Sequence, residues 1–217
     1  MIKKYGLIGK NISYSLSPII YTYWFNEYNI KANYELLDIN EDEFNLKFLE
    51  SLKTNNFYGL NITQPYKLES LKYLNNLSDE LKNIQSCNNI VFKNDNIYGY
   101  NTDYIGLIES FKKIKINLKN KNILILGAGG SSYALIYALQ ILGVRTIEIA
   151  NRNLDKIKNL QNIFPNIVVN DFKLNKNFDI VFNCSSVSFY EILNYFNLFL
   201  NINKKTIFYD FSYYNIN

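Results

Sequence analysis

A lysine preceded by amides and a hydroxyl is the group in this sequence best suited to chemistry. The segment Asn61-Ile62-Thr63-Gln64-Pro65-Tyr66-Lys67 follows the apolar run Phe57 to Leu60. Pro65 fixes one backbone dihedral and keeps Gln64 extended, so that Lys67 follows a stiff corner. A solvated surface lysine needs no such corner. The segment therefore predicts an active-site lysine beside polar groups that bind a small hydroxylated molecule.

A carboxylate far from Lys67 in the sequence is a candidate partner for its ammonium group. Asp103 ends the segment Asn101-Thr102-Asp103, directly before a predicted helix from Tyr104 to Ile114. Residues of these types commonly cap helices, and capping is one interpretation of the segment. In the other interpretation, Asp103 orients the lysine across a cleft and binds a substrate hydroxyl.

Three further polar residues occupy positions from which they can reach a ligand. Ser15 and Ser17 lie two residues apart in a predicted loop, so both hydroxyls can contact one molecule. Pro18 suits the first turn of a helix, and Ser17 is then also a candidate cap. Capping does not explain Ser15. Asn88 lies near an expected strand end, just before the strand-like run Ile90 to Lys93.

The second half of the chain contains a glycine-rich turn in the context that dinucleotide binding requires. The turn Gly127-Ala128-Gly129-Gly130-Ser131-Ser132 follows a strand pattern, Ile123 to Leu126, and precedes a helix pattern, Ser132 to Leu142. Its first glycine permits a tight turn, its second admits a pyrophosphate, and the helix N-terminus faces the negative charge. Serine replaces the last glycine of the fingerprint. The turn predicts a Rossmann-type cofactor domain.

The residues after the next strand favour NADP over NAD. This strand, Thr146 to Ala150, ends at Asn151-Arg152, where an NAD site usually has Asp or Glu to accept the ribose hydroxyls. Arg152 and Lys156 would instead meet a 2′-phosphate. Lys156 also fits a solvated helix position. We expect Asn151, Arg152 and Lys156 to lie at the adenosine end of the cofactor.

Composition excludes several classes of site. The chain has 217 residues, of which 48% are hydrophobic and 19% charged, as in globular proteins. Its net charge of +4 comes from scattered lysines, so no nucleic-acid partner is expected. The absence of histidine rules out a histidine-based triad or metal site. The two cysteines, Cys87 and Cys184, suit reduced thiols in a cytoplasmic protein, and no metal is expected.

A long uncharged stretch needs an explanation. Ile123 to Val144 carries no charge and is long enough to cross a bilayer. The glycine turn interrupts it after a short β-branched run, which fits a buried strand, a turn and a buried helix better. The apolar run after Lys3-Lys4 is too short for a signal peptide. We therefore expect no membrane partner.

Alternating strand and helix patterns predict an α/β protein with a mainly parallel sheet. Ligands of such sheets bind beyond the C-terminal ends of the strands, where the lysine segment lies. The expected strands are Lys4 to Ile8, Asn33 to Ile39, Phe57 to Ile62, Ile90 to Lys93, Ile123 to Leu126, Thr146 to Ala150, Phe178 to Asn183 and Lys205 to Asp210. The expected helices of the first half run from Pro18 to about Asn29, from Glu41 to Leu52 and from Lys67 to Leu74.

In this order, the motifs resemble the shikimate dehydrogenase family over nearly the whole chain. The lysine segment together with Asn101-Thr102-Asp103 is far more specific than the glycine turn. The resemblance implies an N-terminal α/β substrate domain at 1–103 and a Rossmann-type NADP-binding domain at 104–217. It also implies reversible reduction of 3-dehydroshikimate to shikimate with NADPH, in aromatic amino acid biosynthesis.

The resemblance also implies roles for individual residues. Lys67 and Asp103 form the catalytic pair. Substrate-binding residues are Ser15, Ser17, Asn61, Thr63, Asn88 and Tyr213. Cofactor-binding residues are Gly127, Ala128, Gly129, Gly130, Ser131, Asn151, Arg152 and Lys156.

Three departures from the family pattern leave alternatives open. Tyr14 and Tyr21 replace the usual histidines, and Asn183-Cys184-Ser185-Ser186-Val187-Ser188 replaces Asn-Ala-Thr-Ser-x-Gly. We also expect the chain to lack the family's C-terminal helices, which carry a substrate-binding glutamine. One alternative is a non-catalytic homologue that binds a shikimate-like ligand or a partner protein. Another is a quinate/shikimate dehydrogenase that uses NAD. A homodimer is compatible with each.

Overall fold

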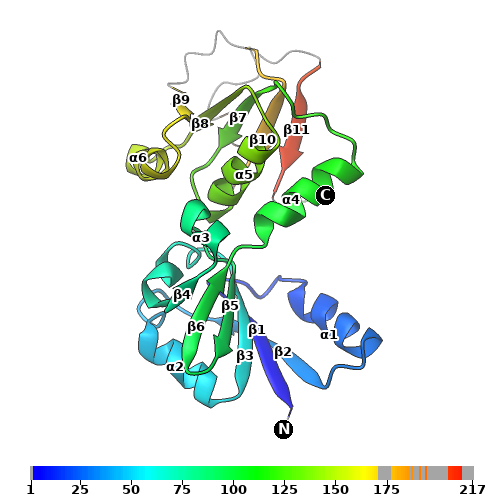
Figure 1. Ribbon diagram of the computed structural model, residues 1–217, viewed down its shortest axis with the longest axis vertical. Helices are drawn as coiled ribbons and strands as arrows, with labels where there is room; N and C mark the ends of the chain where they lie inside the picture. The colour runs from blue at the N-terminus through cyan, green and yellow to red at the C-terminus, as the bar shows by residue number, and fades with distance from the viewer. Residues whose placement is uncertain are drawn as a thin grey trace. The chain divides into compact units, whose positions relative to one another are not determined.

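The computed structural model describes residues 2–170, 177–185, 187, 191, 194 and 205–211. The chain divides into two compact units, Met1–Thr102 and Asp103–Asn217 (Figure 1). The domain boundary expected from the sequence lies one residue later. The α/β fold class is confirmed, with one sheet in each unit.

The first unit contains a six-stranded sheet in the order β2-β1-β3-β5-β6-β4. Its strands are β1 (Lys3–Gly9), β2 (Ala32–Asp38), β3 (Phe57–Ile62), β4 (Asn76–Leu77), β5 (Asn89–Lys93) and β6 (Asn96–Tyr100). β1 is parallel to β2 and β3, whereas β5 is antiparallel to both β3 and β6. Three of the five strand pairings are parallel and β5 alone runs against its neighbours, so the sheet is mainly parallel, as expected, with one antiparallel strand. Asn94 and Asp95 both have positive φ angles (48° and 63°), which suits a two-residue hairpin between β5 and β6.

The helices of the first unit are shorter than the sequence pattern predicts. They are α1 (Ser17–Glu27), α2 (Leu46–Thr54), the 3-10 helix η1 (Glu69–Tyr73) and α3 (Asp79–Ile84). α2 begins five residues later than expected, because the Asn45 side chain accepts the Phe48 N–H at 3.0 Å and caps it there. The helix expected from Lys67 to Leu74 is only the short 3-10 turn η1.

One residue of the lysine segment, Tyr66, belongs to the core of the first unit. Tyr66 is 2% exposed, and its ring stacks on Phe44 at 4.4 Å between centroids. Its hydroxyl donates to the Ile39 carbonyl at 2.7 Å. A tyrosine that is both packed and hydrogen-bonded holds its backbone firmly. The position of Lys67, the next residue, is therefore set by the core.

The second unit is a five-stranded parallel sheet in the order β11-β10-β7-β8-β9. Its strands are β7 (Asn122–Leu126), β8 (Thr146–Ala150), β9 (Val168–Val169), β10 (Ile180–Asn183) and β11 (Ile207–Asp210), and its helices include α4 (Asp103–Lys113), α5 (Gly130–Ile141) and α6 (Leu154–Ile163). From β7 the chain moves outward to β8 and β9, then returns to the other side of β7 with β10. This reversal is the topological switch point at which Rossmann-type sheets bind nucleotides. The glycine turn directly follows β7.

The uncharged stretch at 123–144 is buried within the second unit. β7 is buried from Ile123 to Leu126, and most residues of α5 are buried as well. A helix that is apolar all round belongs in the interior of a domain or in a membrane. Among the residues that the structure describes, no helix combines the length and hydropathy needed to cross a bilayer.

Asp179 ties the start of β7 to the chain entering β10. Its carboxylate accepts the Asn122 N–H at 2.9 Å and the Lys121 ammonium at 2.9 Å. The Asn122 N–H, followed by Lys121, lowers the pKa of Asp179 below its usual 3.8, and burial opposes them only partly. Because the folded state binds this proton more weakly, Asp179 stabilises the fold above pH 3.8, and this contribution is lost as the pH falls below that value.

We expect Asp179→Asn to flatten the acid branch of the stability profile. The wild-type free energy of unfolding should fall between pH 5 and pH 2, and the variant should lose less over this range. Urea unfolding at a series of pH values measures both curves. Parallel curves for the two proteins would show that Asp179 is not a source of the acid sensitivity.

Candidate active site

The lysine segment leaves the sheet at the end of β3 and turns sharply. The Thr63 N–H donates to the Ile8 carbonyl at 2.9 Å, and the Tyr66 N–H donates back to the Thr63 carbonyl at 2.9 Å. The Lys10 N–H donates to the Gln64 carbonyl at 3.1 Å, which joins the segment to the loop after β1. Two strand ends thus hold the turn that precedes Lys67.

Lys67 itself is bonded through its backbone to the segment that precedes β5. Its carbonyl accepts the Cys87 N–H at 2.8 Å. Burial raises the pKa of the Cys87 thiol, while the nearby positive charge of Lys67 acts weakly in the opposite direction. The Lys67 side chain is half-buried. Cys87 is a buried neutral thiol against which the lysine is positioned.

The Asn88 side chain is hydrogen-bonded to the segment that leads to Asp103. Its Oδ1 accepts the Thr102 N–H at 2.8 Å, and its Nδ2 donates to Thr102 Oγ1 at 2.9 Å. The neighbouring Asn101 donates from Nδ2 to the Ser86 carbonyl at 2.6 Å, and its side chain is buried. The chain is therefore held at both Asn101 and Thr102. Asp103 begins α4 immediately afterwards.

Two consecutive residues thus hold the backbone of Lys67 and that of Thr102, which directly precedes Asp103. Cys87 binds the Lys67 backbone, and Asn88, the next residue, binds Thr102. The predicted contact between the Lys67 and Asp103 side chains stays a prediction. The described hydrogen bonds of Asn88 give it a structural role on Thr102, and its predicted contact with substrate stays a prediction.

Ser15, Ser17 and Asn61 belong to one hydrogen-bonded cluster. Ser15 Oγ donates to Ser17 Oγ at 3.1 Å, and the Ser17 hydroxyl bonds to Tyr34. The Tyr34 hydroxyl in turn donates to Asn61 Oδ1 at 2.6 Å. The structure therefore gathers three of the predicted substrate-binding residues. Tyr34, which links them, was missed.

Ser17 does not cap α1, contrary to one of its two interpretations. It is the first residue of the helix, and Leu16 occupies the capping position without a side-chain hydrogen bond. Ser15 instead accepts the Ser17 N–H on its hydroxyl at 3.2 Å. Pro18 lies in the first turn, as expected. The Ser17 hydroxyl instead accepts a hydrogen bond from Ser15.

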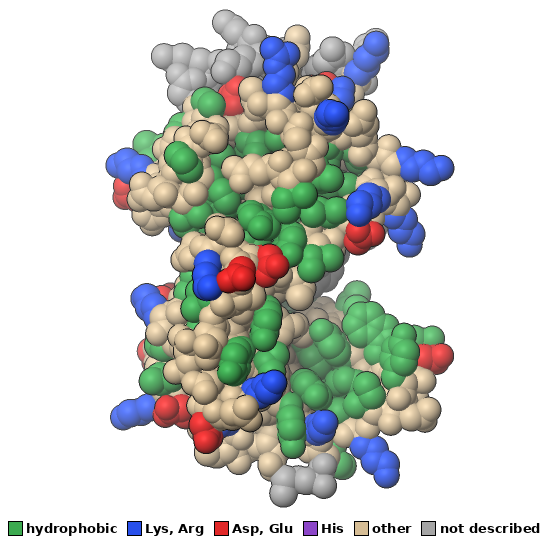
Figure 2. Space-filling model, in the orientation of Figure 1, with side chains coloured by type: hydrophobic (Ala, Val, Ile, Leu, Met, Phe, Trp, Pro, Cys, Tyr) green, Lys and Arg blue, Asp and Glu red, His purple; other side chains and the backbone are tan. Residues whose placement is uncertain are grey.

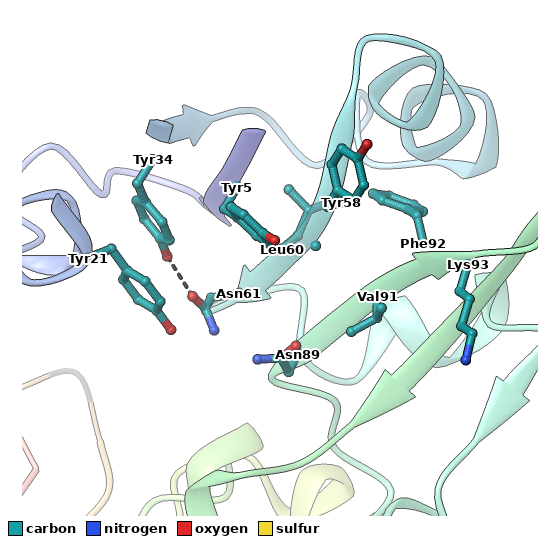
Figure 3. Close-up of a pocket in the computed structure, with 11 residues that line it drawn as sticks. Tyr5, Tyr21, Tyr34, Tyr58, Leu60, Asn61, Asn89, Val91, Phe92 and Lys93 are labelled. Carbon is teal, nitrogen blue, oxygen red and sulfur yellow. Dashed lines mark hydrogen bonds between the residues drawn. The ribbon is translucent and has the colours of Figure 1, made fainter. Parts of the chain in front are cut away.

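A pocket of about 420 Å³ opens on one face of the first sheet, beside this cluster (Figure 3). Asn61 and Asn89 lie at one end of it, as partners in the β3–β5 pairing. Tyr21 stacks on Tyr34 at 4.2 Å with an interplanar angle of 10°. The lining residues are Tyr5, Tyr21, Tyr34, Tyr58, Gly59, Leu60, Asn61, Asn89, Val91, Phe92 and Lys93. Aromatic walls with amides at one end suit a small ring that carries polar substituents.

The glycine turn has the form that a pyrophosphate needs. Gly127 has φ of +106°, and a Cβ there would lie 2.9 Å from the Ser185 backbone nitrogen. Only glycine therefore fits at Gly127. Gly129 has open space where a Cβ would stand, and it directly precedes α5, whose N-terminus favours negative charge. The buried Ser132 hydroxyl donates to the Gly127 carbonyl at 2.8 Å and closes the turn. These residues fit a dinucleotide.

The end of β8 carries positive charge and amides, as predicted for NADP. Arg152 is exposed directly after the strand, and Lys156 lies in the first turns of α6. The Asn153 side chain caps α6 by accepting the Asp155 and Lys156 N–H groups. Asn151 donates from Nδ2 to the Asn153 carbonyl at 2.8 Å, which shapes the loop.

The acidic residues of this region are engaged elsewhere. Glu148 on β8 is 5% exposed and accepts a hydrogen bond from Asn170 at 2.9 Å. The exposed Asp155 pairs with Lys158 at 3.2 Å. Neither carboxylate takes the place of the acidic residue that ends this strand in NAD sites.

Some predictions lie beyond the described part of the chain. Tyr213, Ser186 and Ser188 are among the residues outside it. Asn183 and Ser185, from the same loop, are described, and the Asn183 amide donates to Asp210 at 3.0 Å. In the part of the chain that the structure describes, no three acidic, cysteine or histidine side chains group as metal ligands.

Two family models match the two units in order. The shikimate dehydrogenase substrate binding domain matches residues 7–90, and shikimate / quinate 5-dehydrogenase matches residues 109–207. The chain belongs to the shikimate dehydrogenase family.

Curated relatives and solved structures agree with this membership. A shikimate dehydrogenase (NADP(+)) of Clostridium botulinum (strain Loch Maree / Type A3) is 38% identical over 184 residues, which are 84% of this chain and 70% of that protein. That of Pelagibacter ubique is 36% identical over 215 residues, 98% of this chain and 80% of its own length. The crystal structure of the Aquifex aeolicus shikimate dehydrogenase superposes with a TM-score of 0.86 at 34% identity and covers 98% of this chain and 79% of its own.

Two glycine substitutions should separate folding from cofactor binding. Gly129→Ala should leave the melting temperature nearly unchanged, because no atom lies within 4 Å of its Cβ, yet raise the KM for NADPH at least roughly tenfold by occupying the pyrophosphate space. Gly127→Ala should lower the melting temperature, because its Cβ meets the backbone of the loop after β10. Thermal unfolding and steady-state kinetics measure both effects. An unchanged KM in Gly129→Ala would contradict the assigned cofactor position.

Proposed function

We propose that this protein catalyses the reversible, NADPH-dependent reduction of 3-dehydroshikimate to shikimate. The main support for this proposal is that the two units match the two family models, in the order in which the family has them. The chain is an NADP-dependent oxidoreductase of this family. A shikimate dehydrogenase of Thermus thermophilus, 25% identical, was solved with NADP(H) and shikimate.

The residues of the lysine segment supply what carbonyl reduction requires. When bound, NADPH supplies the hydride. The oxygen of the reduced carbonyl gains negative charge, and the Lys67 ammonium stabilises it and delivers a proton. Asp103 holds the ammonium in position. Their backbone supports on Cys87 and Asn88 favour this assignment.

The substrate is a ring acid with several hydroxyls, and the first unit offers matching groups. Ser15, Ser17, Asn61 and Thr63 present hydroxyls and an amide near the end of β3. A site built from such groups penalises analogues that lack the matching hydroxyls, because its own polar groups would remain unpaired. We propose these four residues as direct substrate contacts, together with Asn88 and Tyr213.

Lys67→Ala should lower kcat for NADPH oxidation with 3-dehydroshikimate by roughly 10²–10⁴-fold, the usual contribution of a general acid. The matched control is Lys72→Ala. Lys72 lies five residues later in η1, where its exposed ammonium pairs with Glu69. Steady-state rates of the purified variants measure the effect. Wild-type turnover in Lys67→Ala would refute the catalytic role. Wild-type protein that binds shikimate without turnover would identify a non-catalytic homologue.

On the cofactor side, we propose that residues 127–131 contact the pyrophosphate and that Asn151, Arg152 and Lys156 contact the adenosine 2′-phosphate. The exposed cation at the end of β8 supports this assignment. Arginine binds phosphate through two parallel hydrogen bonds, which a ribose hydroxyl cannot match.

Arg152→Ala should therefore raise the KM for NADPH roughly 10- to 100-fold, from the loss of charged hydrogen bonds. The KM for NADH, which lacks the phosphate, should change little. Arg145→Ala is the control, since Arg145 is exposed at the opposite end of β8. Equal effects on both cofactors would place the phosphate elsewhere. Quinate as a parallel substrate tests the polyol preference.

We further propose that the protein acts in the cytoplasm and forms a homodimer through α1. Neither Cys87 nor Cys184 forms a disulfide, which suits a reducing compartment. α1 contains no buried residue and only one charged residue, Glu27. Hydrophobic side chains gather over it (Figure 2).

The composition of this surface matches the core of a dimer interface. Ile19, Tyr23, Trp24 and Tyr28 are 70%, 63%, 46% and 71% exposed. Aromatic residues are enriched in such cores and charged residues depleted. A buried aromatic residue contributes about 150–250 Å², and a standard interface takes about 800 Å² from each partner. The area of the exposed α1 face is of that order. A second copy of the chain would offer the same surface, with Glu27 as its one charged residue on α1.

Trp24, the single tryptophan, reports directly on this interface. Its emission should shift to shorter wavelength as protein concentration rises, because the indole leaves water. Sedimentation should show a dimer over the same range, and Tyr23→Lys should abolish both. A monomer at all concentrations would exclude a second copy as the occupant of this surface.

A further inference from the structure

Tyr34 makes the shortest polar contact in the pocket cluster, and neither the catalytic nor the cofactor assignments use it. Its hydroxyl donates to Asn61 Oδ1 at 2.6 Å, across the intervening strand β1 (Figure 3). β2, which carries Tyr34, and β3, which carries Asn61, both pair with β1 and not with each other. Only a long side chain can connect them. The contact is therefore built by the sheet and is not a local turn.

The direction of the hydrogen bonds follows from the donors along the cluster. Ser15 donates to Ser17, which lies beside Tyr34, and Tyr34 donates to Asn61. The single hydroxyl proton of Tyr34 is directed to Asn61 Oδ1. Burial raises the pKa of Tyr34 well above its usual 10, so the hydroxyl stays protonated and remains a donor over the physiological range. Stacking on Tyr21 at 4.2 Å keeps the ring in place.

The hydrogen bond from Tyr34 to Asn61 Oδ1 fixes the orientation of the Asn61 amide group, and therefore the direction of its Nδ2. Its Nδ2 is directed away from Tyr34, on the side of the pocket where Asn89 lies (Figure 3). An amide rotated by 180° would present its oxygen there and repel the oxygen atoms of a ligand. The orientation therefore selects a ligand that offers a hydroxyl or carboxylate oxygen.

We propose that Tyr34 is a positioning residue that orients Asn61 as a hydrogen-bond donor to a substrate oxygen. This inference rests on the proposed function and adds a determinant of substrate affinity to it. Tyr34 acts through Asn61 and makes no contact with the reacting carbonyl. Its loss should therefore weaken shikimate binding and leave the chemical step intact.

The test is the Tyr34→Phe variant of the full chain, assayed with shikimate and NADP. Phenylalanine keeps the ring that stacks on Tyr21 and removes only the hydroxyl. The expected result is a KM for shikimate raised about tenfold, with kcat and the KM for NADP within twofold of wild type. Tyr98→Phe, at a half-buried tyrosine on β6 that does not line the pocket, is the control for removal of a hydroxyl. An unchanged KM for shikimate in Tyr34→Phe would overturn the inference.

A double-mutant cycle separates positioning from a general structural effect. Tyr34→Phe should cost nothing further in an Asn61→Ala background, because the residue that it positions is gone. Additive losses would show that Tyr34 acts independently of Asn61 and would overturn the inference. If Tyr34→Phe does not fold, Asn61→Asp replaces it. Aspartate keeps the acceptor for Tyr34 but has no donor, so it should bind shikimate as weakly as Asn61→Ala. Wild-type affinity in Asn61→Asp would contradict the proposal.

Calorimetric titration with shikimate keeps this inference distinct from the enzymatic assignment. A wild-type chain that binds shikimate without turnover would refute the proposed reaction. The dissociation constants of Tyr34→Phe and Asn61→Asp would still decide the role of Tyr34.

Discussion

The hydrogen bonds made by Cys87 and Asn88 are the constraint on which the catalytic assignment depends. One residue holds the Lys67 carbonyl and the next holds Thr102, so two segments far apart in sequence are fixed at consecutive positions. Asn88 is 8% exposed, and both its Oδ1 and its Nδ2 are hydrogen-bonded. If Thr102 moved away, these buried polar atoms would be left without partners, at the full cost of their desolvation. A neutral, buried thiol at Cys87 adds no competing charge. These two hydrogen-bonded residues therefore fix the backbone from which the proposed catalytic side chains project.

The second unit follows a different physical logic. Its cofactor loop is shaped by backbone clearance, since Gly127 touches the loop after β10 and Gly129 faces open space. The serine that replaces the fingerprint's last glycine is buried and closes the turn through its hydroxyl. This substitution keeps the turn by a hydrogen bond where the usual sequence relies on close packing. The departure at Ser132 is therefore compatible with nucleotide binding.

Local signals in the sequence predicted the parts of the fold that depend on neighbours along the chain. The strand, glycine turn and helix at 122–141 are of this kind, as is the strand that ends at Ile62. The antiparallel hairpin was missed because Asn94-Asp95 is a weak turn signal in a chain rich in asparagine. Tyr34 was missed for a stronger reason. Its partner Asn61 is two strands away, and that order is set by packing of the whole sheet. The hydrogen bonds of Asn88 to Thr102 were not predicted, because they depend on how the chain before β5 packs beside the chain after β6, which only the structure shows.

A crystal structure of the chain with shikimate and NADP tests the central claim most directly. The quantities to measure are the distances from one substrate hydroxyl to Lys67 Nζ and to the Asp103 carboxylate. The account predicts that both lie within hydrogen-bond distance of the same hydroxyl, next to the nicotinamide. A substrate that contacts only one of the two groups, or that binds away from the end of β3, would contradict it.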